Sequence, residues 1–294
     1  MRSVGKTLPF RGEEVPVQEL TKDSFAGVDI ALFSAGGGTS KEFAPAAAAA
    51  GAIVIDNSSA FRMDPEVPLV IPEVNPLDVR SVPKGIIANP NCTTIITLMG
   101  LTPLHREFGL RNIIASSYQA VSGSGAQGIA ELESQVRAIV AGQPVVRNVY
   151  PHQIAFNVIP QVDTFEENGY TREEMKMQNE GRKILHLESL NASVTCVRVP
   201  VYRSHSVAVT ATFARPVDVD RARVCIDAAP GVRVCDDRAT ALYPTPLDTS
   251  EKDDCLVGRI RRDLVSDNGL TFWVVGDQVR KGAALNAVQI AEIL

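Results

Sequence analysis

Apolar and polar positions in the first third of the chain alternate between strand-like and helix-like patterns. Residues 28–33 form a short apolar run followed by Gly36-Gly37-Gly38, and residues 52–55 form a near-continuous apolar run, typical of a strand covered on both faces. Between these runs, Thr39 or Ser40 is expected to cap a helix that ends before Gly51. This strand–helix–strand order predicts a parallel sheet with right-handed crossovers.

The remainder of the chain is richer in β-type runs and hairpin signals. We expect strands at residues 113–120, 192–200, 206–214 and 256–275, the last broken at the turn sequence Asp267-Asn268-Gly269. Helices are expected at residues 126–140, at 171–187, where Thr171 and Glu174 have capping-box spacing, and at 282–294. Strands joined by hairpins predict a mixed or antiparallel sheet, so we expect an α/β first domain and an α+β second domain. The predicted division is residues 1–92, residues 93–275, and a C-terminal helix, residues 276–294, that returns to the first domain.

Composition narrows the classes of function. The 294 residues carry a formal net charge of -5, which gives no reason to expect nucleic acid or an anionic membrane as a partner. No apolar run approaches the roughly 18 residues that a membrane span needs, and no signal-peptide pattern follows Met1. Five cysteines without CxxC pairs argue against a disulfide framework or a zinc ribbon, and we expect no metal site. The sequence therefore predicts a cytoplasmic enzyme with reduced thiols.

One cysteine stands at a predicted helix start. Asn89-Pro90-Asn91-Cys92-Thr93-Thr94 precedes an apolar run, so Asn91 is the expected N-cap and Cys92 lies in the first turn. The helix dipole and the unpaired N–H groups there are expected to lower the thiol pKa below about 8.5 and to bind an oxyanion. The alternative is an inert cysteine packed as a small hydrophobic side chain. For Cys196, Cys225, Cys235 and Cys255, which lack such a cap, the inert interpretation is preferred.

Four segments then resemble one family, the aspartate-semialdehyde dehydrogenases, in family order across nearly the whole chain. They are Ala88-Asn89-Pro90-Asn91-Cys92-Thr93-Thr94, Tyr118-Gln119-Ala120-Val121-Ser122-Gly123-Ser124-Gly125, Arg198-Val199-Pro200-Val201 with Arg203-Ser204-His205-Ser206, and Lys281-Gly282-Ala283-Ala284-Leu285-Asn286. The resemblance implies a Rossmann-type NADP-binding domain and a catalytic and dimerisation domain of the glyceraldehyde-3-phosphate-dehydrogenase-like type. It also implies a homodimer that uses NADP(H), a small-molecule substrate and inorganic phosphate.

The implied reaction is NADPH-dependent reductive dephosphorylation of L-aspartyl-4-phosphate to L-aspartate 4-semialdehyde, in lysine, threonine and methionine biosynthesis. Carried over by position, Cys92 is the nucleophile that forms an acyl-thioester, His205 the acid/base, and Gln119 the orienting side chain. The implied substrate contacts are Arg198 for the α-carboxylate, Glu173 for the amino group, Arg62 and Lys176 for the phosphate, and Asn91. The implied cofactor contacts are Arg2, Ser3, Gly36, Ser58, Ser122, Gly123 and Gln278.

These residue types suit the chemistry, although each has a structural alternative. A thiolate attacks an acyl phosphate readily, and an unperturbed histidine pKa near 6.5 would suit proton transfer at neutral pH. Without the family, however, His205 between two serines is equally a hydrogen-bonded turn residue. Glu173 and Lys176 have the spacing of an ordinary helix-surface ion pair, and Arg62 resembles a solvated loop cation. The glycines of residues 122–125 could merely serve a turn.

The family's opening strand and GxxGxxG turn are not found before Arg2-Ser3, a pair that resembles the family's 2′-phosphate loop. We therefore expect a form shortened by one β–α–β unit, through a misplaced start or as a real product, that binds NADPH poorly. The alternatives are an N-acetyl-γ-glutamyl-phosphate reductase, or an inactive subunit that acts only as a dimer partner. A phosphorylating glyceraldehyde-3-phosphate dehydrogenase is less favoured, because its Ser-Cys-Thr-Thr-Asn segment is absent.

Overall fold

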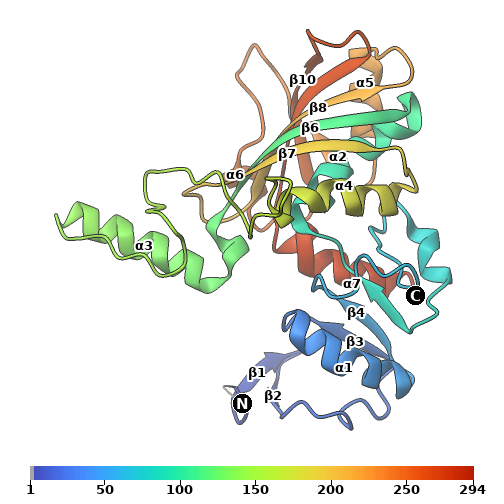
Figure 1. The fold of residues 1–294 in the computed structure, drawn as a ribbon, viewed down its shortest axis with the longest axis vertical. Coiled ribbons are helices and arrows are strands. Elements are labelled where there is room, and N and C mark those ends of the chain that lie inside the picture. Colours follow the sequence, from blue (N-terminus) through green and yellow to red (C-terminus); the bar gives the residue numbers. More distant parts are fainter. Residues whose placement is uncertain (1–2) are drawn as a thin grey trace.

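The computed structural model describes residues 3–294, arranged around two sheets that share one continuous hydrophobic core (Figure 1). The smaller sheet contains three parallel strands in the order β3 (Ile30–Phe33), β4 (Ile53–Asp56) and β5 (Ile86–Ala88). Helix α1 (Gly37–Ala49) connects β3 to β4, which confirms the predicted strand–helix–strand unit. A short hairpin, β1 (Thr7–Phe10) and β2 (Glu13–Pro16), precedes it and was not expected from the apolar pattern.

The predicted cap of α1 is wrong. The helix begins two residues before Thr39, with Gly36 as the N-cap at φ 91° and no side-chain cap. Only glycine adopts that backbone conformation without strain, so the turn after β3 is set by Gly36. The Ser40 hydroxyl instead donates to Asp56 Oδ1 at 2.6 Å, which ties α1 to the end of β4.

The larger sheet has six strands in the order β7-β6-β8-β11-β10-β9. Its members are β6 (Leu110–Gln119), β7 (Asn191–Arg198), β8 (His205–Phe213), β9 (Val232–Val234), β10 (Cys255–Arg262) and β11 (Gly269–Gly276). The β6–β7 and β9–β10 pairs are parallel and the other neighbours are antiparallel. The mixed sheet and the hairpin at residues 267–269 are therefore confirmed.

Helices α2 (Cys92–Phe108), α4 (Arg172–Leu185) and α5 (Val219–Asp227) pack against this sheet. Helix α2 is buried along nearly its whole length, as its apolar sequence predicts. Helix α4 has the predicted capping box between Thr171 and Glu174. Helix α3 (Ala126–Val140) extends to one side of the molecule (Figure 1). The remaining short elements are 3₁₀ turns at Pro76–Arg80 and Val121–Ser124, and α6 (Pro246–Thr249).

The C-terminal helix lies between the two sheets (Figure 1). It opens with a π-helical turn, Arg280–Ala284, and continues as α7 (Leu285–Glu292). Ala287 and Ile290 pack with Ile55, Val70 and Ile87 of the smaller sheet and its connections. The division at residues 92 and 275 stays a prediction, since one core cluster contains residues from both sheets. Within residues 3–294, no helix combines the length and apolar character that crossing a bilayer requires.

Candidate active site

The first turn of α2 carries Cys92, and its backbone is capped as the sequence predicted. The Asn91 side-chain oxygen accepts hydrogen bonds from the N–H groups of Thr93 at 3.0 Å and Thr94 at 3.2 Å. The Asn91 N–H in turn donates to Glu180 Oε2 at 2.7 Å. Cys92 itself is half-buried. The cap thus fixes the backbone of the first turn of α2, which carries Cys92.

The electrostatic prediction for Cys92 is wrong in sign. Burial, followed by the Glu173 carboxylate, raises the pKa of the Cys92 thiol to about 11, although Arg62 and Arg198 oppose the increase. Desolvation disfavours a thiolate more strongly than the end of one helix favours it. The thiol form therefore predominates at neutral pH, and ionisation requires a change in the surrounding charges. Burial raises the pKa of Cys196 and Cys255 further, to about 12, in keeping with inert thiols.

His205 lies at the start of β8 and is 1% exposed. Burial and the neighbouring Arg198 cation lower its pKa to about 3, so the expected value near 6.5 is wrong and the imidazole is neutral at physiological pH. Its Nδ1 accepts the Ala120 N–H at 3.1 Å, which assigns the proton of the neutral ring to Nε2. His205 is therefore arranged to donate from Nε2.

Arg198 and Gly123 adjoin this imidazole. Arg198 is buried at the end of β7 and donates from Nη1 to the Ala120 carbonyl at 2.7 Å. A Cβ atom added to Gly123 would lie 2.9 Å from Arg198 Nη1 and 3.3 Å from His205 Nε2. The segment at residues 122–125 thus serves more than a turn, because its backbone must approach both side chains closely.

Gln119, Glu173 and Lys176 form a second polar group beside α2. Gln119 Nε2 donates to Thr93 Oγ1 and, at 3.0 Å, to Glu173 Oε1. Glu173 also accepts from Asn91 Nδ2 at 3.0 Å and from Lys176 Nζ at 2.8 Å. Burial opposes ionisation of Glu173, but Lys176 and the two amide donors outweigh it and lower the pKa to about 2. Glu173 is therefore a buried anion, and the reading of this pair as an ordinary surface ion pair is wrong.

Two observations suit this group to ligand binding. Gln119 Oε1 is buried and has no hydrogen-bond partner among the residues that the structure describes. Buried amide oxygens are normally paired, so this atom is available to a ligand. Lys176 is less buried than Glu173 and also pairs with Asp163 Oδ2 at 3.3 Å, which places an ammonium group at the edge of the site.

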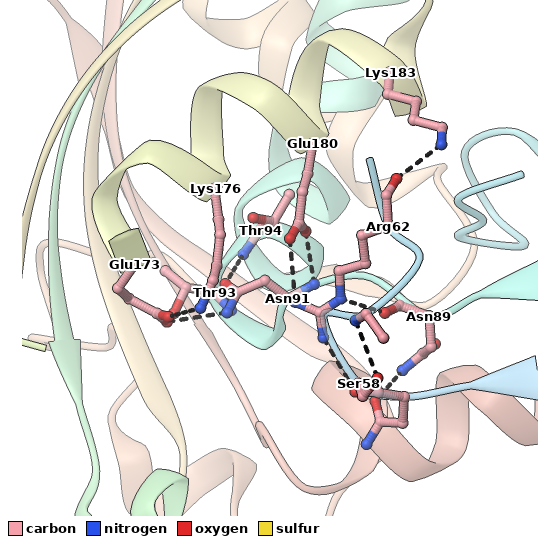
Figure 2. Close-up of polar contacts among 12 residues, drawn as sticks. Ser58, Arg62, Asn89, Asn91, Thr93, Thr94, Glu173, Lys176, Glu180 and Lys183 are labelled. Carbon is pink, nitrogen blue, oxygen red and sulfur yellow. Dashed lines mark hydrogen bonds and ion pairs between the residues drawn. The ribbon is translucent and has the colours of Figure 1, made fainter. Parts of the chain in front are cut away.

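Arg62 is 8% exposed and is not a solvated loop cation. Its Nε donates to the Asn89 carbonyl at 2.9 Å, Nη1 to Glu180 Oε1 at 3.1 Å, and Nη2 to the Asn57 carbonyl at 3.2 Å. Figure 2 shows Glu180 between Arg62 and Asn91. Glu180 was missed by the sequence analysis, although Glu173, Lys176, Glu180 and Lys183 recur at helical spacing and together mark one face of α4.

The expected cofactor contacts fall into two groups. Gly36 and Ser58 follow β3 and β4, at the carboxyl ends of parallel strands, where doubly wound sheets bind nucleotides. In the other group, Gln278 donates to the Ser122 hydroxyl and accepts from the Ser204 N–H at 2.7 Å, close to Gly123. Ser3 is exposed in the turn before β1, and Arg2 lies outside the described residues.

A further glycine, Gly282, lies close to Cys92 and is absent from the predicted site residues. A Cβ atom on Gly282, in the π-helical turn, would lie 3.0 Å from Cys92 Cβ. The segment Lys281–Asn286 had been recognised only as part of the resemblance. Its position against α2 accounts for the glycine, because a side chain there would press on the cysteine. Among residues 3–294, no group of three or more His, Cys, Asp and Glu residues is placed to hold a metal ion.

Comparisons with known proteins agree along the whole chain. Residues 1–82 match the semialdehyde dehydrogenase NAD binding domain, and residues 101–281 match the semialdehyde dehydrogenase dimerisation domain. Aspartate-semialdehyde dehydrogenase of Aquifex aeolicus is 51% identical over 296 residues, covering 100% of this chain and 87% of that protein. The Bacillus subtilis enzyme is 49% identical over 301 residues, with the same coverage.

Solved structures give the same result. The crystal structure of aspartate semialdehyde dehydrogenase II from Vibrio cholerae superposes with a TM-score of 0.97 at 46% identity, covering 100% of this chain and 87% of that one. A second structure of that protein, in complex with ASA, matches equally well. With two domain models and full-length relatives in agreement, this chain belongs to the aspartate-semialdehyde dehydrogenase family.

Proposed function

We propose that this protein catalyses the NADPH-dependent reductive dephosphorylation of L-aspartyl-4-phosphate to L-aspartate 4-semialdehyde, in the biosynthesis of lysine, threonine and methionine. The single observation that carries the proposal is the gathering of one carboxylate and two guanidinium groups around the first turn of α2. Asn91 binds Glu173 and is joined to Arg62 through Glu180, and the charge of Arg198 acts on Cys92. A substrate with an amino group, a carboxylate and a phosphate presents the complementary charges. The relatives named above are aspartate-semialdehyde dehydrogenases, a name that fits the proposed reaction in the direction of aldehyde oxidation.

Substrate binding is assigned to side chains held by several elements. Arg198, from β7, pairs with the α-carboxylate, for which a planar guanidinium is suited. Glu173 pairs with the amino group, and Arg62 and Lys176 bind the phosphate. Asn91 and the open Oε1 of Gln119 orient the acyl group. Because binding of an ammonium group would neutralise the Glu173 charge that raises the Cys92 pKa, the substrate itself favours ionisation of the thiol.

Cys92 Sγ then attacks the acyl carbon, the bond to the phosphate oxygen breaks, and inorganic phosphate leaves with the electron pair and with the proton given up by the thiol. The acyl group remains on Sγ as a thioester. His205, neutral with its proton on Nε2, donates a hydrogen bond to the carbonyl oxygen, on which negative charge would develop when a hydride is added to the thioester carbon. The oxyanion would then re-form the carbonyl group, which breaks the carbon–sulfur bond and releases the aldehyde and the Cys92 thiolate.

The residues present suit a nicotinamide dinucleotide. Helix α1 starts at Gly36 without a side-chain cap, and Cβ atoms at Gly36 and Gly38 would meet nothing within 4 Å, so its N–H groups are accessible to an anionic ligand. Gly36 and Ser58 would hold the adenosine side, and Ser122, Gly123 and Gln278 the nicotinamide side. When bound, NADPH supplies the hydride that reduces the thioester. Preference for NADP over NAD is proposed from Arg2 and Ser3 alone.

Purified protein should reduce NADP+ when given L-aspartate 4-semialdehyde and phosphate, as followed by NADPH absorbance. N-acetyl-glutamate semialdehyde is the control substrate, since faster turnover with it would favour the N-acetyl-γ-glutamyl-phosphate reductase alternative. NADPH titration, together with labelling of Cys92 by an electrophile, tests the other alternative. Labelling without cofactor binding would favour a subunit that serves only in a dimer. A homodimer in the cytoplasm is the assembly and location that we propose.

A further inference from the structure

One face of α4 carries four alternating charges, Glu173, Lys176, Glu180 and Lys183, at spacings of three, four and three residues (Figure 2). These spacings place all four side chains on the same side of a helix. Glu173 and Lys176 belong to the substrate site described above. Glu180 and Lys183 have no role in that assignment, and both contact the segment that carries Arg62.

Glu180 joins two parts of the site that are far apart in the sequence. Its side chain is 2% exposed; Oε1 accepts from Arg62 Nη1 at 3.1 Å, and Oε2 accepts from the Asn91 N–H at 2.7 Å. Arg62 lies in the connection after β4, whereas Asn91 is the N-cap of α2. One carboxylate therefore sets the position of a cation relative to the helix start that bears Cys92.

Lys183 holds the backbone of the same segment. Its Nζ donates to the carbonyl oxygens of Arg62 at 2.8 Å, Asp64 at 2.6 Å and Val67 at 2.6 Å. These three bonds use all three ammonium protons and close residues 62–67 into a loop fastened to α4. Glu180 thus restrains the side chain of Arg62 while Lys183 restrains its backbone.

A buried ion pair is weak evidence for stability, because the cost of desolvating both charges can exceed their attraction. The presence of such an ion pair is better explained when one of its charges must be held at a fixed position for function. Arg62 is such a charge, since it is one of two guanidinium groups whose field reaches Cys92. Groups that act on a reacting centre must be held within a fraction of an ångström, which requires supporting contacts of this kind.

We propose that Glu180 is a positioning residue for the reaction, holding the Arg62 guanidinium in register with the first turn of α2 so that it meets the phosphate beside Cys92. The proposal rests on the proposed function, in which Arg62 is a phosphate contact. It concerns Arg62 alone, and the contacts of Arg198 with the carboxylate should be unaffected.

The substitution Glu180→Gln tests the two hydrogen bonds that Glu180 accepts, from Arg62 and from the Asn91 N–H. A carboxylate offers one acceptor oxygen to each partner, whereas an amide has a single oxygen and would present an N–H group to the other partner. Glu180→Gln therefore keeps the size of the side chain and loses one of the two bonds. Glu180→Asp keeps both acceptors and the charge but is one methylene shorter.

Kinetics of aldehyde oxidation with varied phosphate test the proposal. Glu180→Gln should raise the KM for phosphate about 10-fold, the order expected for one lost charge-assisted hydrogen bond, while the KM for the aldehyde changes less than about 2-fold. In an Arg62→Ala background the same change should add less than about 2-fold, because Glu180 acts through Arg62. An unchanged KM for phosphate, or an equal factor in both backgrounds, overturns the proposal.

Glu174→Gln is the matched control. Glu174 is also buried on α4 and also accepts two hydrogen bonds, in its case both from backbone N–H groups, of Thr171 at 2.7 Å and of Cys196 at 2.9 Å. It forms no hydrogen bond with Arg62 or Asn91. It should lower the melting temperature without changing the KM for phosphate. If Glu180→Gln does not fold, Glu180→Asp provides the same test, with a rise in the same constant expected.

Protection of Cys92 from iodoacetamide by inorganic phosphate gives a readout that does not depend on turnover. The phosphate concentration for half protection should rise about 10-fold in Glu180→Gln. If the wild-type protein turns over normally but the phosphate concentration for half protection does not rise in Glu180→Gln, only the positioning role of Glu180 is contradicted, and the proposed function stands. If the wild-type protein shows no phosphate-dependent turnover but that concentration does rise in Glu180→Gln, the proposed function is contradicted and the positioning role is supported.

Discussion

The two helices that begin at this site, α1 and α2, start in opposite ways. Helix α1 opens at Gly36 with no side-chain cap and with empty space around Gly36 and Gly38. Helix α2 opens at Asn91, whose side chain occupies two N–H groups and whose own N–H is bound by Glu180. Both N-termini favour negative charge. The first is left accessible to a ligand, whereas the second is already ordered around its own cysteine.

The difference indicates where precision is needed. Binding of a dinucleotide tolerates small displacements, whereas attack on an acyl group depends on the position of each reacting atom. At the end that holds Cys92, hydrogen bonds join Gln119 to Glu173 and fasten Arg198 and His205 to the Ala120 backbone. These contacts link β6, β7, β8 and α4. Changes at that end should therefore cost more activity than equivalent changes at the start of α1.

Replacement of the nucleophile should have the largest effect. Cys92→Ser is expected to lower turnover at least about 1,000-fold, because a serine hydroxyl is far less ionised and less nucleophilic than a thiol. Ser58→Ala, at the nucleotide end, should act mainly on the KM for NADP+. Phosphate-dependent aldehyde oxidation measures both, with melting temperature as the control for folding. Substantial turnover by Cys92→Ser would remove the basis for the mechanism.

A pair of glycine substitutions compares the two ends with the same added methyl group. Gly123→Ala places Cβ 2.9 Å from Arg198 Nη1 and 3.2 Å from His205 Cε1, so both side chains must shift. We expect kcat/KM to fall about 100-fold, in line with the sensitivity of catalysis to displacements of about 1 Å. Gly38→Ala meets nothing within 4 Å and should leave kcat nearly unchanged. Equal losses from the two variants would contradict the distinction between the ends.

Removal of the charge at Glu173 should have two moderate effects of opposite sign: faster alkylation of Cys92 and slower turnover. The Glu173 carboxylate raises the pKa of Cys92, so Glu173→Gln should lower that pKa and increase the thiolate fraction at neutral pH. Alkylation of Cys92 below its pKa should become about 10-fold faster, which corresponds to about one pKa unit. Turnover should nevertheless fall, since the proposed contact of Glu173 with the substrate amino group is lost. An alkylation profile identical to that of the wild type would show that the carboxylate does not govern the thiol.

The last expected effect is on stability in acid and not on activity. His205 has a pKa near 3 in the folded protein against 6.5 as a free side chain, so the unfolded state binds the additional proton as the pH falls through 6.5. Stability should therefore be lost between pH 6.5 and about 3, at about 1.4 kcal/mol per pH unit in the middle of that range. His205→Asn should flatten the fall in melting temperature over this range. The exposed His152→Asn is the control, and equal slopes in wild type and His205→Asn would contradict the low pKa.

Several features could be predicted from the sequence because they depend on neighbours along the chain. The Asn91 cap, the Thr171–Glu174 capping box and the hairpin after β10 follow from residue types within a few positions of one another. The wrong prediction for the cap of α1 also has a local cause. Gly36 supplies a positive φ and begins the helix before Thr39 can act as its cap. The short hairpin of β1 and β2 lacks buried residues, so the apolar pattern carried no signal for it.

The sequence by itself determined the order of most of the longer strands and helices, the place of Cys92 at a helix start, and the family. Tertiary structure alone decided the ionisation of the site, because desolvation and charge come from partners that are distant in sequence. Glu173 reaches Asn91 across 82 positions, Glu180 reaches it across 89, and the His205 imidazole accepts the Ala120 N–H across 85. A helix start favours a thiolate through its own backbone, but the buried surroundings assembled by α4, β6 and β8 reverse that preference.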